Sequence, residues 1–203
     1  MARAEPGGAP GSALVRLTGP RLREVLAAAA ERLRGPARLS LVGETALVAA
    51  GVQEWTDRLV YAVDAHAPAG LERAIRDAAA LRGVEVDRES PADVLPVPAG
   101  SDERARALDG WTDLPPLEVL AFDPVSVALR LVARGNEPDY QTVLAFLRHG
   151  WLTMGDLEFA LAEALPRFSA DRIQQDPAEF RRKFKGMQQM WRASSAPAAG
   201  RVP

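Results

Sequence analysis

The stretch LSLVGETALVAAGVQEWTDRLVYAVD, residues 39–64, decides the fold of this chain. It begins inside the apolar run ARLSLV (37–42), which is typical of a short strand. Gly43 breaks that run, and ETALVAAGV directly after it has the composition of a helix. RLVYAV (58–63) is rich in β-branched and aromatic residues, which favours a second strand. The stretch therefore predicts a strand, a glycine turn, a helix and another strand in close succession.

Further elements are predicted on both sides of this stretch. Apolar residues at helical spacing predict one helix between Thr18 and Gly35 and another over LERAIRDAAALR (71–82). LEVLAF (117–122) predicts a strand, and VEV (84–86) and DVLPV (93–97) are shorter strand candidates. Strands and helices thus alternate in the first part of the chain.

The remainder of the chain is predicted to be helical. Asp123 is placed as a capping carboxylate before Pro124, which opens the helical pattern PVSVALRLVAR. Further helices are expected over YQTVLAFLRHG, from Thr153 to Leu165 and from Pro177 to Trp191.

The expected fold class is therefore α/β in the broad sense (α+β). An α/β domain over residues 18–122 carries a C-terminal helical lobe over residues 123–192. The Gly-, Pro- and Ala-rich segments 1–17 and 193–203 are expected to be flexible tails.

Composition excludes several kinds of site. The chain has 203 residues, 25 basic and 27 acidic side chains and a net charge of −2, which argues against a nucleic-acid footprint over the whole surface. It has no cysteine and only two histidines, so a disulfide framework, a thiolate nucleophile and a histidine-rich metal site are excluded. The apolar runs are too short to span a bilayer, and the first residues lack an apolar signal core. We therefore expect a cytoplasmic protein.

Residues 39–64, together with DVLPV and LEVLAFDPVSVALRLVARGNEPDYQTVLAFLRHGWLT, resemble bacterial proteins of the nucleotidyltransferase superfamily found in toxin–antitoxin and abortive-infection systems. The likeness covers roughly residues 20–160. It implies a mixed sheet flanked by helices, a glycine turn that approaches the phosphates of an NTP, and aspartates that hold Mg²⁺. In that family the second strand has the pattern Arg-x-Thr-x-Asp-x-Asp, and a later strand supplies a third carboxylate.

Carried over to this chain, the resemblance places nucleotide binding at Gly43, Glu44 and Thr45. Aligning Thr56 with the family threonine puts Arg58 and Val60 where the two metal-binding aspartates are expected. Glu44 stands where the family has a small residue, and a carboxylate there repels phosphate.

Other carboxylates offer only partial replacements. Asp57 and Asp64 are seven residues apart, which places them on opposite faces of an uninterrupted strand. Asp93 is the candidate for the third carboxylate and for a metal ligand. Arg130 takes the position of the family lysine and is a candidate phosphate contact. Asp139 fits the first downstream aspartate, while Thr142 replaces the second.

The resemblance with these departures implies a diverged nucleotidyltransferase-like protein that has lost transfer chemistry and acts by binding a protein or nucleic-acid partner. The alternative is an active Mg²⁺-dependent enzyme that moves NMP from an NTP to a protein or RNA acceptor. In that alternative, Asp57, Asp64 or Glu44 joins Asp93 on the metal, and Arg58 or Arg130 contacts phosphate.

A second alternative is a DNA- or RNA-binding accessory protein. Its candidate residues are Arg181, Arg182, Lys183 and Lys185, which are interleaved with large apolar residues. Those apolar residues share one helix face, which favours core packing or a partner groove, with the cations on the wet side. By contrast, the nine acidic residues between 85 and 118 are interpreted mostly as a solvated, loop-rich surface.

Overall fold

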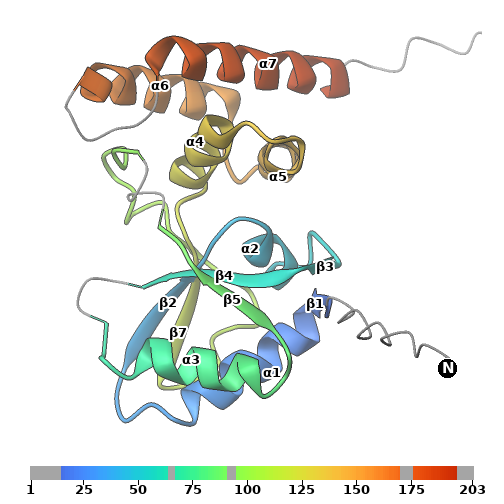
Figure 1. Cartoon of the computed structure of the whole chain (residues 1–203), viewed down its shortest axis with the longest axis vertical. Coiled ribbons are helices and arrows are strands. Elements are labelled where there is room, and N and C mark those ends of the chain that lie inside the picture. The colour runs from blue at the N-terminus through green and yellow to red at the C-terminus, as the bar shows by residue number, and fades with distance from the viewer. Residues whose placement is uncertain (1–14, 64–66, 91–94, 170–175, 196–203) are drawn as a thin grey trace, which may run out of the picture.

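The computed structural model describes residues 15–63, 67–90, 95–169 and 176–195, which form a sheet lobe and a helical lobe (Figure 1). The sheet lobe contains β1 (Leu17–Thr18), α1 (Gly19–Ala30), β2 (Ala37–Leu41), α2 (Glu44–Ala49), β3 (Trp55–Thr56), β4 (Arg58–Val63), α3 (Leu71–Ala80), β5 (Glu85–Arg88), β6 (Arg106–Ala107) and β7 (Leu117–Ala121). The helical lobe contains α4 (Pro124–Arg134), α5 (Glu137–Arg148), α6 (Met154–Ala164), the 3-10 turn η2 (Leu165–Ser169) and α7 (Pro177–Ser195). The expected α+β class with a helical C-terminal lobe is confirmed.

The main sheet is mixed and has five strands in the order β5-β4-β2-β7-β6. The central strand β2 runs parallel to β7 and antiparallel to β4, and β4 runs parallel to β5. The last residues of β2 lie beside the beginning of β4, because Leu41 is opposite Tyr61 and the Val42 amide donates to the Val60 carbonyl at 3.0 Å. The turn at Gly43 therefore opens next to the two β4 positions that the sequence singled out.

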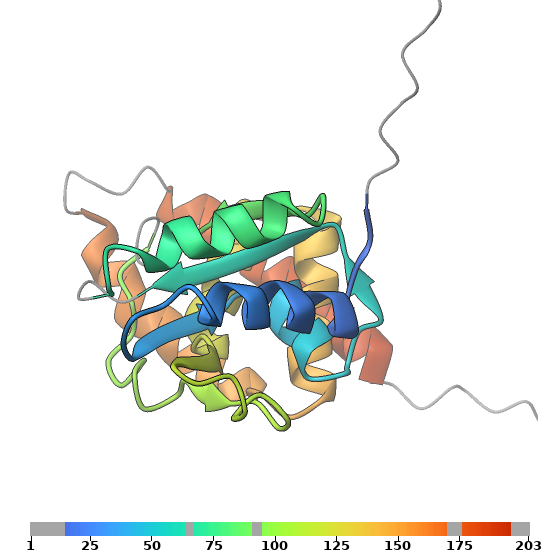
Figure 2. The ribbon, with the colours of Figure 1, turned by 90° about the horizontal axis from the view of Figure 1, so that it is seen from below.

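The core consists of two apolar clusters. In the first, α1 and α3 pack side by side over one face of the sheet, as Figure 2 shows, around buried residues such as Leu39 and Ile75. The second fills the helical lobe with side chains such as Phe146 and Phe180. It also includes Leu47 of α2, so the helical lobe is anchored on the turn region after β2.

The helix ends follow the sequence signals. Asp123 caps α4 by accepting from the amides of Val125 (3.0 Å) and Ser126 (3.3 Å), as predicted. Thr153 and Asp156 form a capping box at the start of α6. These caps fix the direction in which the helical lobe leaves the sheet.

Some boundaries differ from the prediction. Leu17, expected in the N-terminal tail, is fully buried and pairs with Thr56, because β1 and β3 form a small antiparallel sheet of their own. At the other end α7 continues to Ser195, into the expected C-terminal tail. Of the strand candidate DVLPV, residues 95–97 are not extended in a sheet, and its first two residues lie outside the described residues.

None of the helices in the described ranges is long and apolar enough to cross a membrane.

Candidate functional site: a cleft between the lobes

A cavity of about 370 Å³ lies where the end of β2 meets the beginning of β4, β5 and the helices α4 and α5. Both lobes contribute charged side chains to its wall. They are the carboxylates Glu44, Asp57, Asp87, Glu89 and Asp139 and the guanidinium groups Arg58, Arg130 and Arg134. We call this cavity the cleft.

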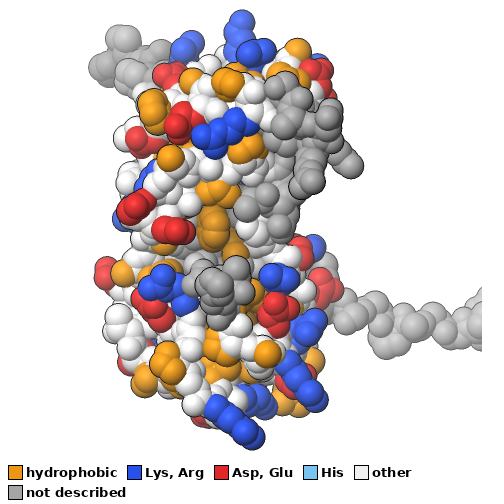
Figure 3. Space-filling model, turned by 90° about the vertical axis from the view of Figure 1, so that its left-hand side faces the viewer, with side chains coloured by type: hydrophobic (Ala, Val, Ile, Leu, Met, Phe, Trp, Pro, Cys, Tyr) orange, Lys and Arg blue, Asp and Glu red, His pale blue; other side chains and the backbone are white. Residues whose placement is uncertain are grey.

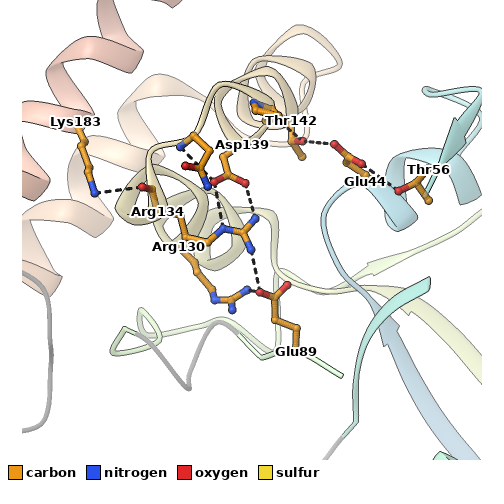
Figure 4. A network of polar contacts seen from close by, with 10 residues as sticks. Glu44, Thr56, Glu89, Arg130, Arg134, Asp139, Thr142 and Lys183 are labelled. Atoms are coloured by element: carbon orange, nitrogen blue, oxygen red, sulfur yellow. Dashed lines mark hydrogen bonds and ion pairs between the residues drawn. The ribbon is translucent and has the colours of Figure 1, made fainter. Parts of the chain in front are cut away.

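Glu44 lies between hydroxyl groups of the two lobes. It is the first residue of α2, and its carboxylate accepts from the Thr56 hydroxyl at 3.0 Å (Figure 4). The Thr142 hydroxyl lies 3.4 Å from its other oxygen and shares its one proton with the Pro138 carbonyl at 3.1 Å. Thr142 belongs to α5, so this pair of contacts links the sheet lobe to the helical lobe. A carboxylate therefore directly follows the glycine turn, and its negative charge would repel a phosphate that approaches Gly43.

The side chain of Thr45 has a structural role. Its side chain is fully buried and is not part of the cleft wall. The hydroxyl accepts from the Val60 amide at 2.9 Å and donates to the Arg58 carbonyl at 3.2 Å. Thr45 thus fastens α2 to the first residues of β4.

On the opposite wall two arginines of α4 are bound to carboxylates. Arg130 forms an ion pair with Glu89, just after β5, and Arg134 reaches the same carboxylate at 3.2 Å (Figure 4). Arg134 also donates from Nε to Asp139 of α5 at 3.1 Å. The network consists of these two arginines and two carboxylates. Glu89 is its one member from the sheet lobe, and the other three belong to the helical lobe.

Burial distinguishes Arg130 from the other arginines of the cleft. Its side chain is 12% exposed, and the Nε atom has no hydrogen-bond partner among the described residues. Burial, together with the positive charge of Arg134, lowers the pKa of Arg130 to about 10. Arg130 still carries its charge at neutral pH, and Glu89 balances that charge.

The cleft contains most of the residues predicted for the nucleotide and metal site. Gly43, Glu44, Asp57, Arg58 and Arg130 all line it. The two further carboxylate candidates, residues 64 and 93, lie outside the described residues.

Asp87 and Glu89 were missed, because their segment was interpreted mostly as a solvated surface. The pairing of β5 with β4 puts Asp87 directly opposite Val60, and Glu89 follows by the strand's period of two. The alternation of Glu85, Asp87 and Glu89 was the available signal in the sequence. It points to the cleft only once the parallel partner of β5 is known.

The donor set does not fit the two-metal chemistry that the resemblance implies. No group of three His, Cys, Asp or Glu residues within the described ranges is arranged to hold a metal ion. The positions where the family has its metal-binding pair carry Arg58 and Val60, and both line the cleft. Asp57 and Asp87 also line it, but Glu89 and Asp139 are already engaged by arginines.

The predicted nucleic-acid residues of α7 fall into two groups. Lys183 is bonded within the helical lobe: its Nζ donates to the carbonyls of Ala133 (2.7 Å) and Arg134 (3.2 Å). Arg181, Arg182 and Lys185 are exposed. The expected core role of the interleaved apolar residues is confirmed, since Phe180, Phe184 and Met187 are buried.

No protein-family model, no curated protein and no solved structure matches this chain. The fold and the cleft define its class by themselves. It is a two-lobed α+β protein in which a mixed sheet meets a helical lobe at a cleft with charged walls.

Proposed function

We propose that the chain is a diverged nucleotidyltransferase-like protein that does not transfer nucleotides and acts by binding a protein or nucleic-acid partner. Its place in a toxin–antitoxin or abortive-infection system and its location in the cytoplasm belong to the same proposal. The order of strands, glycine turn and helices supports the likeness in architecture, and the composition of the cleft supports the loss of chemistry.

A single observation carries this proposal. At the beginning of β4, next to the glycine turn, the cleft is lined by Arg58 and Val60 rather than by a pair of carboxylates. Nucleotidyl transfer needs hard oxygen ligands that converge on divalent ions bridging the triphosphate. A guanidinium and an isopropyl group supply no such ligand.

The contacts of Glu44 support the same conclusion. The Thr56 hydroxyl donates to the carboxylate, and the Thr142 hydroxyl lies 3.4 Å from its other oxygen. A phosphate entering at Gly43 would have to displace these contacts and would meet a negative charge there. The Glu44 carboxylate thereby disfavours phosphate at the point where the resemblance places the nucleotide.

The test is thermal unfolding of the full chain with ATP, GTP, CTP and UTP in turn, each with Mg²⁺ and again with EDTA. A ligand that binds only the folded state raises the unfolding midpoint by mass action. We expect no Mg²⁺-dependent shift at millimolar concentration of any of the four nucleotides.

A Mg²⁺-dependent shift for one nucleotide would contradict the proposal and support an active transferase. Asp57 and Asp87 favour that second candidate, because their carboxylates line the cleft and form no side-chain hydrogen bond or ion pair with other described residues. Asp57→Asn and Asp87→Asn would then each be expected to abolish the shift.

A further inference from the structure

The outer face of α7 is a row of cations on the side of the helix away from the core. Phe180, Phe184 and Met187 are buried in the helical lobe, where α7 packs on α4. Arg181, Lys185 and Arg192 are exposed. Because an α-helix has 3.6 residues per turn, spacings of four and eleven residues return to one face. In Figure 3 Lys and Arg side chains project from the top of the molecule, where α7 lies in Figure 1.

These three cations are not used by the fold. None of them forms an ion pair with a carboxylate of the described residues. The carboxylate of α7 nearest to them in sequence, Glu179, lies 3.1 Å from Lys183 and 3.9 Å from Arg182. On the adjacent helix α6, Glu158 accepts a hydrogen bond from Gln188 at 2.7 Å. The row therefore keeps its positive charge.

The spacing of the row fits an extended chain of anions. At a rise of about 1.5 Å per residue, the three Cα positions are separated by about 6 Å and about 10 Å along the helix axis. Two of the three residues are arginines, whose planar fork binds phosphate oxygens in a bidentate manner.

Two other classes of partner fit this face less well. A membrane-surface helix buries an apolar face in the lipid, but the apolar face of α7 is already packed inside the protein. A protein interface draws most of its affinity from buried aromatic or apolar anchors. The row of three cations offers none, and the exposed residue between Lys185 and Arg192 on the same face is Gln189. The absence of an aromatic side chain in this row also disfavours stacking on single-stranded bases.

We infer that the outer face of α7, formed by Arg181, Lys185 and Arg192 with Arg182 at its flank, binds the phosphate backbone of a nucleic-acid duplex. Contacts to phosphate oxygens carry no sequence information, so binding through this row is expected to be independent of sequence. This inference names one partner for the proposed function, and it does not depend on whether the cleft is catalytic.

The experiment is fluorescence anisotropy with a labelled mixed-sequence DNA duplex and an RNA duplex of the same sequence, titrated with the full-length protein at low and moderate salt. Three phosphate contacts predict that binding weakens about 40-fold between 50 mM and 200 mM salt. The double variant Arg181→Glu/Lys185→Glu is expected to weaken binding at least tenfold and to lower the salt slope by about 2.

The matched control is Arg73→Glu/Arg76→Glu on α3, which makes the same change of charge at two exposed positions on the sheet lobe. It is expected to leave most of the binding intact. Circular dichroism checks that both variants remain folded. A preference between DNA and RNA would identify the duplex and would support the inference.

Three results would overturn the inference. One is the absence of binding to either duplex at low salt, and another is an equal loss in the α3 control. The third is binding to a poly-glutamate peptide or to phosphatidylserine vesicles, but to neither duplex, that is lost in the α7 variant. The cleft is judged by the Mg²⁺-dependent part of the nucleotide shift and the α7 face by duplex anisotropy, so either proposal can fail without the other.

Discussion

The cleft and the outer face of α7 both contain arginines, but those of the cleft are mostly paired with carboxylates and those of α7 are exposed. In the cleft, Arg130 and Arg134 form ion pairs with Glu89 of the sheet lobe, and Arg134 forms another with Asp139 of its own lobe. On α7 the exposed row is left without carboxylate partners among the described residues.

The number of charges in a segment therefore does not determine what the segment does; it also matters whether those charges are paired. The cleft has three arginines in its wall, yet two of them are already paired with carboxylates. A nearly neutral chain can still present a local cationic surface, because pairing removes some charges and leaves others accessible. Substitution should therefore cost stability at the paired charges and little at the exposed, unpaired ones.

The largest effect is expected at the carboxylate that joins the lobes. Glu89→Ala leaves Arg130 buried without its counter-ion, and both side chains of this pair are less than one sixth exposed (15% and 12%). We expect the free energy of unfolding to fall by about 2–3 kcal/mol, since removing one partner strands a buried charge. Urea unfolding followed by circular dichroism measures this change.

The control for Glu89 is Glu118→Ala. Glu118 forms an ion pair with Arg38 at 2.8 Å, but both side chains are 53% exposed. Its removal is expected to cost less than about 1 kcal/mol. Equal costs for the two variants would show that the cleft pair is no more important than a surface pair.

The next effect is expected at Gly135, where α4 ends. Its φ of +75° disfavours any residue with a Cβ, and a Cβ built there would lie 2.8 Å from Cδ of Lys183. Gly135→Ala is expected to destabilise the fold by about 2 kcal/mol. Gly150→Ala shares the positive φ of +65° but has nothing within 4 Å of the added Cβ, so it should cost about half as much. Thermal and urea unfolding measure both variants. Gly150→Ala reports the cost of backbone strain alone, and Gly135→Ala reports strain together with a steric clash.

A smaller effect separates two lysines that are two residues apart. Lys183→Ala removes the donor to the Ala133 and Arg134 carbonyls and is expected to cost about 1 kcal/mol. Lys185→Ala changes an exposed side chain and is expected to alter stability by less than about 0.5 kcal/mol. Identical unfolding curves for the two variants would contradict the division of α7 into structural and free cations.

The smallest effect on stability is expected at the residues proposed to bind a duplex. Arg181→Ala and Arg192→Ala should each leave the free energy of unfolding within about 0.5 kcal/mol of the wild type, since neither side chain is part of the core. A substantial loss of stability would show that the fold uses these charges.

Much of the fold was predictable because its signals are local. The Gly43 turn, the cap at Asp123 and the capping box at Thr153 each depend on residues within four positions of one another. The two-residue strands β1 and β3 were missed, because their pairing joins positions about forty residues apart and has no periodicity to detect.

The cleft was predictable only in part, for a similar reason. Gly43, Arg58 and Arg130 were identified through the resemblance, and they do share one cavity. The role of Glu89 depends on the order of strands in the sheet and on where α4 passes over it, and neither is encoded in a short motif. Lys183 could not be separated from Lys185 by charge, since only the packing of α7 on α4 decides which one reaches the carbonyls at the end of α4.

The most direct test of the central claim is nuclear magnetic resonance of the isotope-labelled protein with ATP and substoichiometric Mn²⁺. This paramagnetic ion broadens the amide signals of residues close to it. We expect the signals of Gly43, Glu44 and Val60 to broaden no more than that of Asp77 on the exposed side of α3. Selective broadening of the three cleft signals, reversed by EDTA, would show that the cleft holds a metal-bound nucleotide and would contradict the account.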